Sequence, residues 1–159
     1  IKYLNLNKEN FLKFKLKRGD ILFNRTNAPN LVGKTSIFDL ELDCVFASYL
    51  IRIEVNQNRL IPRFLNYYLN LEVTQQNLKK LASRGVSQSN ISATKLKTLE
   101  LPLPPLSIQQ QIASILSAVD TKIKKEENKK KSLEELFKSM LHNLMTAKIR
   151  VKDLEIPNV

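Results

Sequence analysis

The sequence has few of the residues from which disulfide frameworks, metal sites and most catalytic sites are built. Its 159 residues include one cysteine, Cys44, and one histidine, His142. A single cysteine excludes a disulfide within the chain, and one residue of each kind excludes a Cys/His metal cluster built from this chain alone. A Ser/His/Asp set would depend on His142, which lies in a long helical pattern and is expected at its surface or seam. We therefore predict no catalytic residue, no metal and no cofactor.

Glycine-rich loops and long apolar runs are also missing. With three glycines in all, the chain has no GxGxxG or Walker-type loop for a nucleotide. No apolar run approaches the length of a membrane span, and the first residues lack the charged-then-apolar profile of a signal peptide. The carboxylates are scattered among turns, so their spacing predicts no nuclease-like cluster. These absences argue against a nuclease or methyltransferase acting alone and favour a cytoplasmic binding module.

Positive charge is in excess, and its position indicates what the chain binds. The formal net charge is +11. Residues 1–105 contain 16 Lys and Arg against 8 Asp and Glu, whereas residues 106–159 contain 10 against 7. A basic amino-terminal part followed by a nearly balanced carboxyl-terminal part predicts that the former binds an anionic polymer. The alternative is a lysine-rich surface that binds no nucleic acid.

Short strands and a covering helix are predicted for the amino-terminal part. Segments rich in β-branched and aromatic residues, separated by turn signals, predict an antiparallel or mixed sheet. Pro62 is well placed to begin an amphipathic helix that covers this sheet. The predicted fold class is α+β, with a globular domain at 1–104. The predicted elements are strands at 1–6, 21–26, 31–38 and 45–55, a helix at 62–81, a helical turn at 91–96 and an extended strand at 98–104.

A much longer helix is predicted after Pro104 and Pro105. Ser107 is placed to cap it, and no Gly or Pro follows Ile108 until Pro157, so the pattern predicts about forty helical residues within 105–150 and a tail at 151–159. Its apolar residues repeat every seven positions, which is typical of a coiled-coil helix. They form two lines four residues apart, Ile112, Val119, Leu133, Met140 and Ala147 on one and Leu116, Ile123, Phe137 and Leu144 on the other.

These two lines, called the seam below, both fail in the middle of the helix, at Glu126 and Lys130. The chain has no second helix of similar length, so the seam predicts a partner helix in another subunit. An antiparallel pair that crosses at Asn128 would place Glu126 opposite Lys130 of the partner and Glu127 opposite Lys129. The alternative is an ordinary stripe that faces a core.

Two polar segments of the amino-terminal part are candidates for a binding surface. One follows a predicted strand at 24–27, and the other forms a loop at 84–90. Guanidinium, amide and hydroxyl groups are the types that read base edges and bind phosphates, although Asn and Ser are also frequent in ordinary turns. The residues predicted to contact DNA are Asn24, Arg25, Thr26, Asn27, Lys34, Arg84, Ser87, Gln88, Ser89 and Asn90.

Five stretches, in order along nearly the whole chain, together resemble the specificity subunit of type I restriction-modification systems. The last of them is the most specific, and each of the others alone would be a weak signal. The stretches are GDILFNRTN (19–27), VGKTSIF (32–38), SYLIRI (48–53), SRGVSQSNIS (83–92) and LPLPPLSIQQQIASILSAVDTKI (101–123).

The resemblance implies a non-catalytic target recognition domain that reads one half of a split site on double-stranded DNA. It implies a methyltransferase subunit as partner and, through it, a restriction subunit, with the long helices of two such units packed antiparallel. The family usually has further strands before GDILF, so the domain would lack part of its amino end. A half-subunit that forms a homodimer, a truncated gene and the carboxyl half of a longer subunit all stay open. The alternative function is a coiled-coil scaffold or dimerisation protein with a non-specific basic domain.

Overall fold

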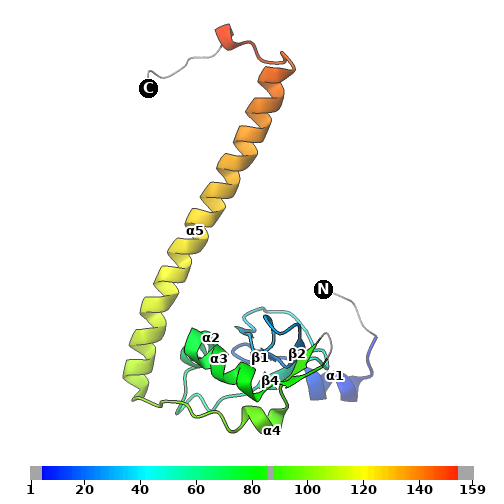
Figure 1. Ribbon diagram of the computed structural model, residues 1–159, viewed down its shortest axis with the longest axis vertical. Helices are drawn as coiled ribbons and strands as arrows, with labels where there is room; N and C mark the ends of the chain where they lie inside the picture. Colours follow the sequence, from blue (N-terminus) through cyan, green and yellow to red (C-terminus); the bar gives the residue numbers. More distant parts are fainter. Residues whose placement is uncertain (1–4, 86–87, 154–159) are drawn as a thin grey trace. The chain divides into compact units, whose positions relative to one another are not determined.

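The computed structural model describes residues 5–85 and 88–153. The chain divides into two compact units, Ile1–Ala113 and Ser114–Val159, and we call the first unit the head. The fold is α+β, with small antiparallel sheets and one long helix, which confirms the predicted class (Figure 1). The elements are α1 (Lys8–Phe14), β1 (Ile21–Asn24), β2 (Thr26–Asn27), β3 (Thr35–Ile37), β4 (Leu50–Ile53), α2 (Pro62–Asn70), α3 (Glu72–Leu81), β5 (Ser83–Arg84), β6 (Ser89–Asn90), α4 (Ala93–Leu96), α5 (Leu106–Met145) and a 3-10 turn (Val151–Asp153).

The first sheet has the strand order β3-β1-β4, and both of its pairs are antiparallel. Along β1, Ile21 and Phe23 are fully buried while Leu22 and Asn24 are half-buried. Since alternate residues of a strand point to opposite faces, the buried pair defines the face that the helices cover. Ile21 accordingly lies in one cluster with Leu65 and Leu69 of α2. The sheet thus forms where the sequence predicts strands, although β3 and β4 are shorter than the predicted segments.

Two predicted strands are not seen among the described residues. Residues 1–4 of the predicted strand 1–6 lie outside the described residues, and the described chain then enters α1, which the sequence analysis missed. Asn7 caps this helix by accepting a hydrogen bond from the backbone N–H of Asn10 at 2.8 Å. The segment 98–104 pairs with no strand in the described structure. Its alternating apolar residues pack against the core instead, since Leu99 and Leu101 contact the cluster of the first sheet and α2.

The helix predicted over 62–81 is in fact two helices, because Leu71 between α2 and α3 is extended (φ −60°, ψ 138°). Gln75 stabilises this break. Its buried side-chain amide donates to the carbonyl of Leu69 at 2.7 Å, which satisfies a carbonyl at the end of α2, and to the carbonyl of Gly33 at 2.8 Å. The break directs Leu78 of α3 into a second core cluster. Helical periodicity predicted the helix but not this change of direction.

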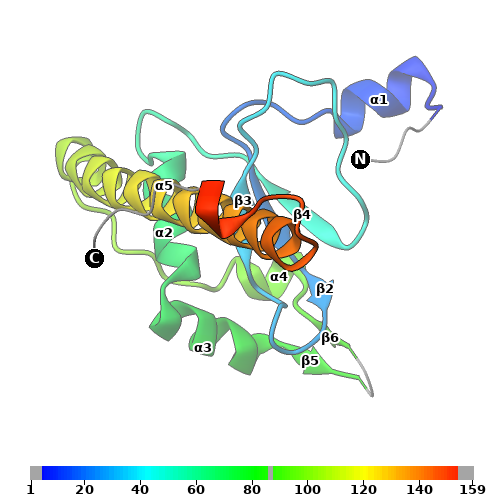
Figure 2. The same ribbon diagram turned by 90° about the horizontal axis from the view of Figure 1, so that it is seen from above.

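A second small sheet has the order β2-β6-β5, and Figure 2 shows its three strands side by side beyond the end of α3. Thr26 pairs with Asn90, and Asn27 pairs with Ser89. The cluster of Phe23, Val32, Leu78 and Ile91, each nearly or fully inaccessible to solvent, supports this sheet. Residues 64 positions apart are therefore held together by the core.

Both ends of α5 differ slightly from the prediction. The carbonyl of Pro105 accepts hydrogen bonds from the N–H groups of Ile108 and Gln109, so Ser107 lies inside the first turn and does not cap it. At the other end the helix stops at Met145, and Ala147 has a left-handed backbone (φ 56°). A left-handed residue ends a helix, so Ala147 does not belong to the seam.

Gln109 joins the first turn of α5 to the rest of the head. The side chain is completely buried. Its amide oxygen accepts from the N–H of Ile61 at 2.9 Å, and its amide nitrogen donates to the carbonyls of Arg59 at 3.0 Å and Pro104 at 2.8 Å. The segment that enters α2 and the segment that enters α5 are therefore fixed by one side chain.

We expect Gln109→Ala to lower the free energy of unfolding of the full chain by about 2–4 kcal/mol, because it leaves three backbone groups without their partner. Gln111→Ala is the matched control, since Gln111 lies on the same helix and is exposed, and it should change stability by less than about 0.5 kcal/mol. Urea unfolding followed by circular dichroism measures both. Equal effects of the two substitutions would show that Gln109 has no special role.

Candidate nucleic-acid interface

The two polar segments singled out in the sequence lie together in the β2-β6-β5 sheet. Besides the backbone pairing of Thr26 with Asn90, the side-chain amide of Asn90 donates to the hydroxyl of Thr26 at 2.6 Å. The N–H of Ile91 donates to the carbonyl of Arg25 at 2.9 Å, which continues the contact by one residue. Segments far apart in the sequence thus form one polar surface of the head.

The other predicted site residues occupy different positions around this sheet. Lys34 is exposed and lies beside the end of β1, where its carbonyl accepts from the N–H of Asn24 at 2.9 Å. Gln88 is exposed and closes the β5–β6 connection by accepting from the N–H of Gly85. Ser89 is buried, so its side chain lies inside the sheet. Ser87 and the side chain of Arg84 lie outside the described part of the structure.

Two buried polar atoms at the end of β1 have no hydrogen-bond partner among the described residues. They are the side-chain oxygen of Asn24 and the Nε of Arg25. Leaving such groups unsatisfied costs about 1–3 kcal/mol each. Unsatisfied groups in a native protein require an explanation, and a functional site is one of the recognised explanations. Both atoms lie where the two polar segments meet.

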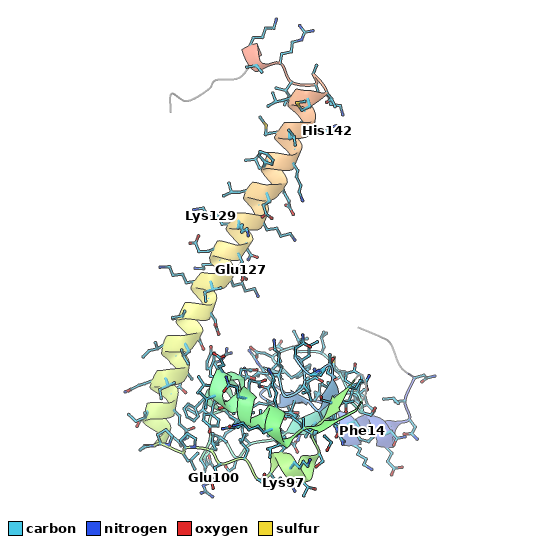
Figure 3. The ribbon with its side chains drawn as sticks, viewed as in Figure 1. Phe14, Lys97, Glu100, Glu127, Lys129 and His142 are labelled. Carbon is cyan, nitrogen blue, oxygen red and sulfur yellow. The ribbon has the colours of Figure 1, made fainter. Side chains whose placement is uncertain are left out.

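Four lysines beside the small sheet were missed by the sequence analysis. Lys79 and Lys80 end α3 immediately before β5, and Lys97 follows α4 (Figure 3). Lys95 of α4 reaches across to the sheet, where its ammonium donates to the carbonyl of Leu81 at 2.9 Å and the hydroxyl of Ser83 at 3.1 Å. Lys95 thus joins the polar surface, whereas Lys79, Lys80 and Lys97 lie on or directly after the helices that adjoin it in the chain.

One sequence signal could have found these lysines. Residues 21–38 and 73–99 contain seven Lys and Arg and no Asp or Glu, and these two ranges contribute all three strands of the small sheet together with α4 and nearly all of α3. The domain's excess charge is thus concentrated on the elements that carry the polar segments. The seven cations are Arg25, Lys34, Lys79, Lys80, Arg84, Lys95 and Lys97.

Apart from Glu72, which begins α3, the acidic side chains of the head lie on other elements, and several of them are partly neutralised there. Arg18 donates from Nε to the Asp39 carboxylate at 2.6 Å, and Arg63 lies 3.7 Å from the same carboxylate. The hydrogen bond and then the charge of Arg18 lower the pKa of the Asp39 carboxyl below its ordinary value. Arg18 also lies 3.3 Å from Glu41. This acidic loop directly follows the range 21–38 in the sequence, and Arg18 and Arg63 lie beside its carboxylates.

Two tyrosines behave differently from each other. Tyr49 is 55% exposed, and its carbonyl accepts from the N–H of Arg25 at 3.1 Å, so an aromatic side chain stands beside the polar surface. Tyr68 is half-buried in α2 and donates its hydroxyl to the carbonyl of Glu100 at 3.0 Å. Tyr68 therefore packs against the segment before α5, whereas the side chain of Tyr49 is open to solvent.

The sequence matches the family model described as type I restriction modification DNA specificity domain over residues 1–135. The chain belongs to this family. It is 34% identical over 143 residues to the putative type I restriction enzyme MjaX specificity subunit of Methanocaldococcus jannaschii, an alignment that covers 89% of this chain and 34% of that relative. It is 31% identical over 142 residues to the MjaVIII specificity subunit of the same organism, covering 87% and 33%. For the HindI specificity subunit of Haemophilus influenzae the identity is 29% over 127 residues, covering 79% and 27%.

This member of the specificity-domain family spans about a third of the length of the two M. jannaschii relatives. The matched range includes the whole polar surface and continues into the middle of α5. The resemblance noted in the sequence is therefore confirmed for the family, and it covers both the head and part of the long helix.

The seam of this specificity domain is largely open to solvent along α5. Val119 is 51% exposed and Phe137 is 67% exposed, and the rest of the seam beyond Ala113 is exposed or half-buried. A helix of 40 residues that keeps so many apolar side chains exposed is typical of one that binds a partner. Its middle is charged, and Lys130 lies 3.9 Å from Glu134 one turn away.

No group of three metal-ligating side chains occurs among residues 5–85 and 88–153. His142 lies on α5, and its ring nitrogen is 3.4 Å from the Lys148 ammonium. Within the same ranges no helix is long and apolar enough to cross a membrane. The candidate site therefore consists of hydrogen-bonding and charged groups at the surface.

We expect Asn24→Leu to leave the free energy of unfolding unchanged or to raise it by up to about 1 kcal/mol, because it replaces an unsatisfied buried oxygen with an apolar group of similar shape. Asn70→Leu is the matched control. The Asn70 side chain accepts from the N–H of Thr35 at 3.1 Å and donates to its carbonyl at 3.0 Å, so this change should cost about 1–2 kcal/mol. Denaturant unfolding that shows a larger loss for Asn24→Leu would mean that Asn24 is a structural residue.

Proposed function

We propose that the chain binds double-stranded DNA through the β2-β6-β5 sheet and reads one part of a split target as the specificity component of a type I restriction-modification complex. The observation that supports this most strongly is that the two polar segments lie together in this sheet. The ranges that contain its strands, 21–38 and 73–99, include seven cations and no acidic residue. A surface of this kind attracts phosphates and presents groups that discriminate bases.

Different residues of the surface suit different tasks. Lys34, Lys79 and Lys80 are exposed cations and suit phosphate contacts, which hold the protein in register on the duplex. Asn90 lies in β6 and Arg25 directly precedes β2. A guanidinium or a carboxamide can form paired hydrogen bonds with a guanine or an adenine edge. The small antiparallel strands have the dimensions that a major groove admits.

The unsatisfied atoms of Asn24 and Arg25 fit this role. Replacing such a polar group with an apolar side chain of similar shape is neutral or stabilising, so stability alone does not explain why these groups are present. Asn24 and Arg25 are half-buried, so parts of both residues stay open to a duplex, and their retention favours a binding role over a purely structural one. The exposed Tyr49 beside Arg25 offers an aromatic face and a hydroxyl to the same duplex.

The seam of α5 suits antiparallel pairing with a second long helix. A register that crosses at Asn128 places Ile112 level with Leu144 and Ile123 level with Leu133, while Glu126 meets Lys130. The pair would hold two recognition domains at a set separation, as the reading of two half-sites requires.

Exposed apolar side chains of α5 also lie outside the seam, and we propose that they contact partner subunits. Ile115 and Leu136 are 65% and 57% exposed, and each precedes a seam residue by one position, so a pair of helices would leave them at its edge. The relatives are named as specificity subunits of restriction enzymes, so by that relation we propose a methyltransferase subunit on this edge and a restriction subunit bound through it.

Substitution of Arg25 and Lys34 should separate base reading from phosphate binding. Arg25→Ala should weaken binding to the preferred duplex by about 1–3 kcal/mol and relax selection at one base pair. Lys34→Ala should weaken all duplexes alike and lower the salt dependence by about one released ion. Arg63→Ala removes the same charge from α2 and should change neither quantity. Fluorescence anisotropy at several salt concentrations measures these effects, and an equal loss for Arg25→Ala on preferred and random duplexes would reassign Arg25 to the phosphates.

Selection of bound duplexes from a random pool tests the proposed function itself. The chain should enrich one short motif, because each recognition domain reads one part of a split site. Adding a methyltransferase subunit should sharpen the selection without altering that motif. A pool that stays random, with binding abolished by moderate salt, would favour a coiled-coil scaffold with a non-specific basic head.

A further inference from the structure

The first sheet ends in two outer strands, and the edge of β3 is closed by a side chain. The carbonyl of Lys34 bonds to the N–H of Asn24, which follows β1. Backbone groups alternate in direction along an antiparallel strand, so the N–H and C=O of Thr35 point away from β1. The carboxamide of Asn70 accepts from this N–H at 3.1 Å and donates to this carbonyl at 3.0 Å. One side chain thus takes the place of a neighbouring strand.

The edge of β4 has no such partner. The N–H of Arg25 donates to the carbonyl of Tyr49, and the same alternation directs the backbone groups of Ile51 and Ile53 toward β1 and those of Arg52 outward. Among the described residues β1 is the only strand that pairs with β4, and the N–H and C=O of Arg52 have no hydrogen-bond partner there. Native proteins normally cover an open edge, because it is a template for a further strand.

An apolar groove of about 340 Å³ lies at this open edge. It is lined by β4, by Leu65 and Leu69 of α2, by Leu96 of α4 and by the segment 97–101. This segment has the alternating apolar pattern of a strand, yet it pairs with no strand in the described part of the chain. Two strand-like segments with free backbone groups therefore border one apolar groove.

The charges of the groove favour an acidic group in its occupant. Arg52 is already bonded, since its guanidinium donates to the carbonyl of Lys15 at 2.6 Å and lies 3.2 Å from the Glu54 carboxylate. Lys97, labelled in Figure 3, is exposed, and no ion pair reaches it among residues 5–85 and 88–153. An acidic side chain would therefore find a free cation at the rim of an apolar groove.

We propose that this groove binds an extended strand of a second polypeptide chain. The strand pairs with the open edge of β4, places alternate apolar side chains against Leu65, Leu69 and Leu96, and brings an acidic side chain to Lys97. In this mode of binding, main-chain hydrogen bonds supply affinity and the groove selects the alternating side chains. The proposal concerns the first sheet and does not depend on DNA binding by the β2-β6-β5 sheet.

Other occupants satisfy only part of these features. A small apolar molecule would fill the groove but leave the N–H and C=O of Arg52 without partners. Pairing of two copies of this chain through their β4 edges would satisfy Arg52 but leave the groove empty, because Ile51 and Ile53 of each copy already pack against its own core. A strand from a different chain has side chains free to enter the groove.

Hydrogen exchange of the full chain tests whether the two edges differ. The amide of Arg52 should be at least about tenfold less protected than the amide of Thr35, because only the latter is hydrogen-bonded. Asn70→Ala should lower the protection of Thr35 to the level of Arg52. Equal protection of the two amides in the wild type would overturn the proposal, since β4 would then have no open edge.

Selection of random peptides by the full chain tests the docking itself, with peptides of about seven residues, which span the four residues of β4. Enriched peptides should alternate apolar and polar residues, carry an acidic residue and increase the protection of the Arg52 amide. Ala93→Phe should weaken their binding by about tenfold or more, because Ala93 is exposed and lines the groove, so the larger side chain fills it. The matched control is Thr94→Phe on the same helix, where the side chain is exposed and does not line the groove, and binding should change by less than about twofold.

A repeated selection with Lys97→Glu should enrich peptides with a basic residue in place of the acidic one. Enrichment of no peptide, or of peptides that Ala93→Phe and Thr94→Phe bind equally well, would overturn the proposal. Protection of the Arg52 amide that grows with the concentration of the chain alone would place a second copy at the edge and would also overturn it. Duplex selection measures DNA binding separately, so these outcomes leave the proposed function untouched.

Discussion

Four buried side chains hold the proposed DNA-binding surface of the head in place. Phe23, Val32, Leu78 and Ile91 form one cluster with almost no solvent access. Each lies directly beside a polar or basic part of the surface: Phe23 precedes Asn24, Val32 and Gly33 precede Lys34, Leu78 precedes Lys79, and Ile91 follows Asn90. The polar residues have little core contact of their own. Their positions depend on apolar neighbours that the hydrophobic effect brings together.

This arrangement explains how short strands suffice for the site. Strands of two residues contribute few backbone hydrogen bonds, and alone they would not be stable. Here β2 and β6 join at their ends to core residues, and Gln75 connects α3 to the same region through the carbonyl of Gly33. Gly33 itself has a left-handed backbone (φ +89°) and is buried against Leu78 and Ile91, so a side chain there would be strained. The position of the site therefore depends on buried supports.

The sequence predicted much of this, and its failures have physical causes. Composition and periodicity predicted β1, β3, β4 and α5, since each of these segments has the residue pattern typical of its element. They missed the break at Leu71, because the break depends on the contact of Gln75 with residues 42 positions away. Polar density predicted the segments at 24–27 and 84–90. The lysines at 79, 80, 95 and 97 were missed. They stand out only when the ranges 21–38 and 73–99, which contain no acidic residue, are considered together, and it is the fold that brings these ranges together.

The central claim is that DNA contacts the β2-β6-β5 sheet and its lysine border, and backbone amide chemical shifts report this directly. Titration of the ¹⁵N-labelled chain with a short random-sequence duplex at low salt should shift the amides of residues 24–27, 34, 79–84 and 88–97. The amides of the acidic loop at 39–43 and of the first turns of α2 should stay unchanged. Shifts concentrated on those two segments, with the small sheet unaffected, would contradict the account.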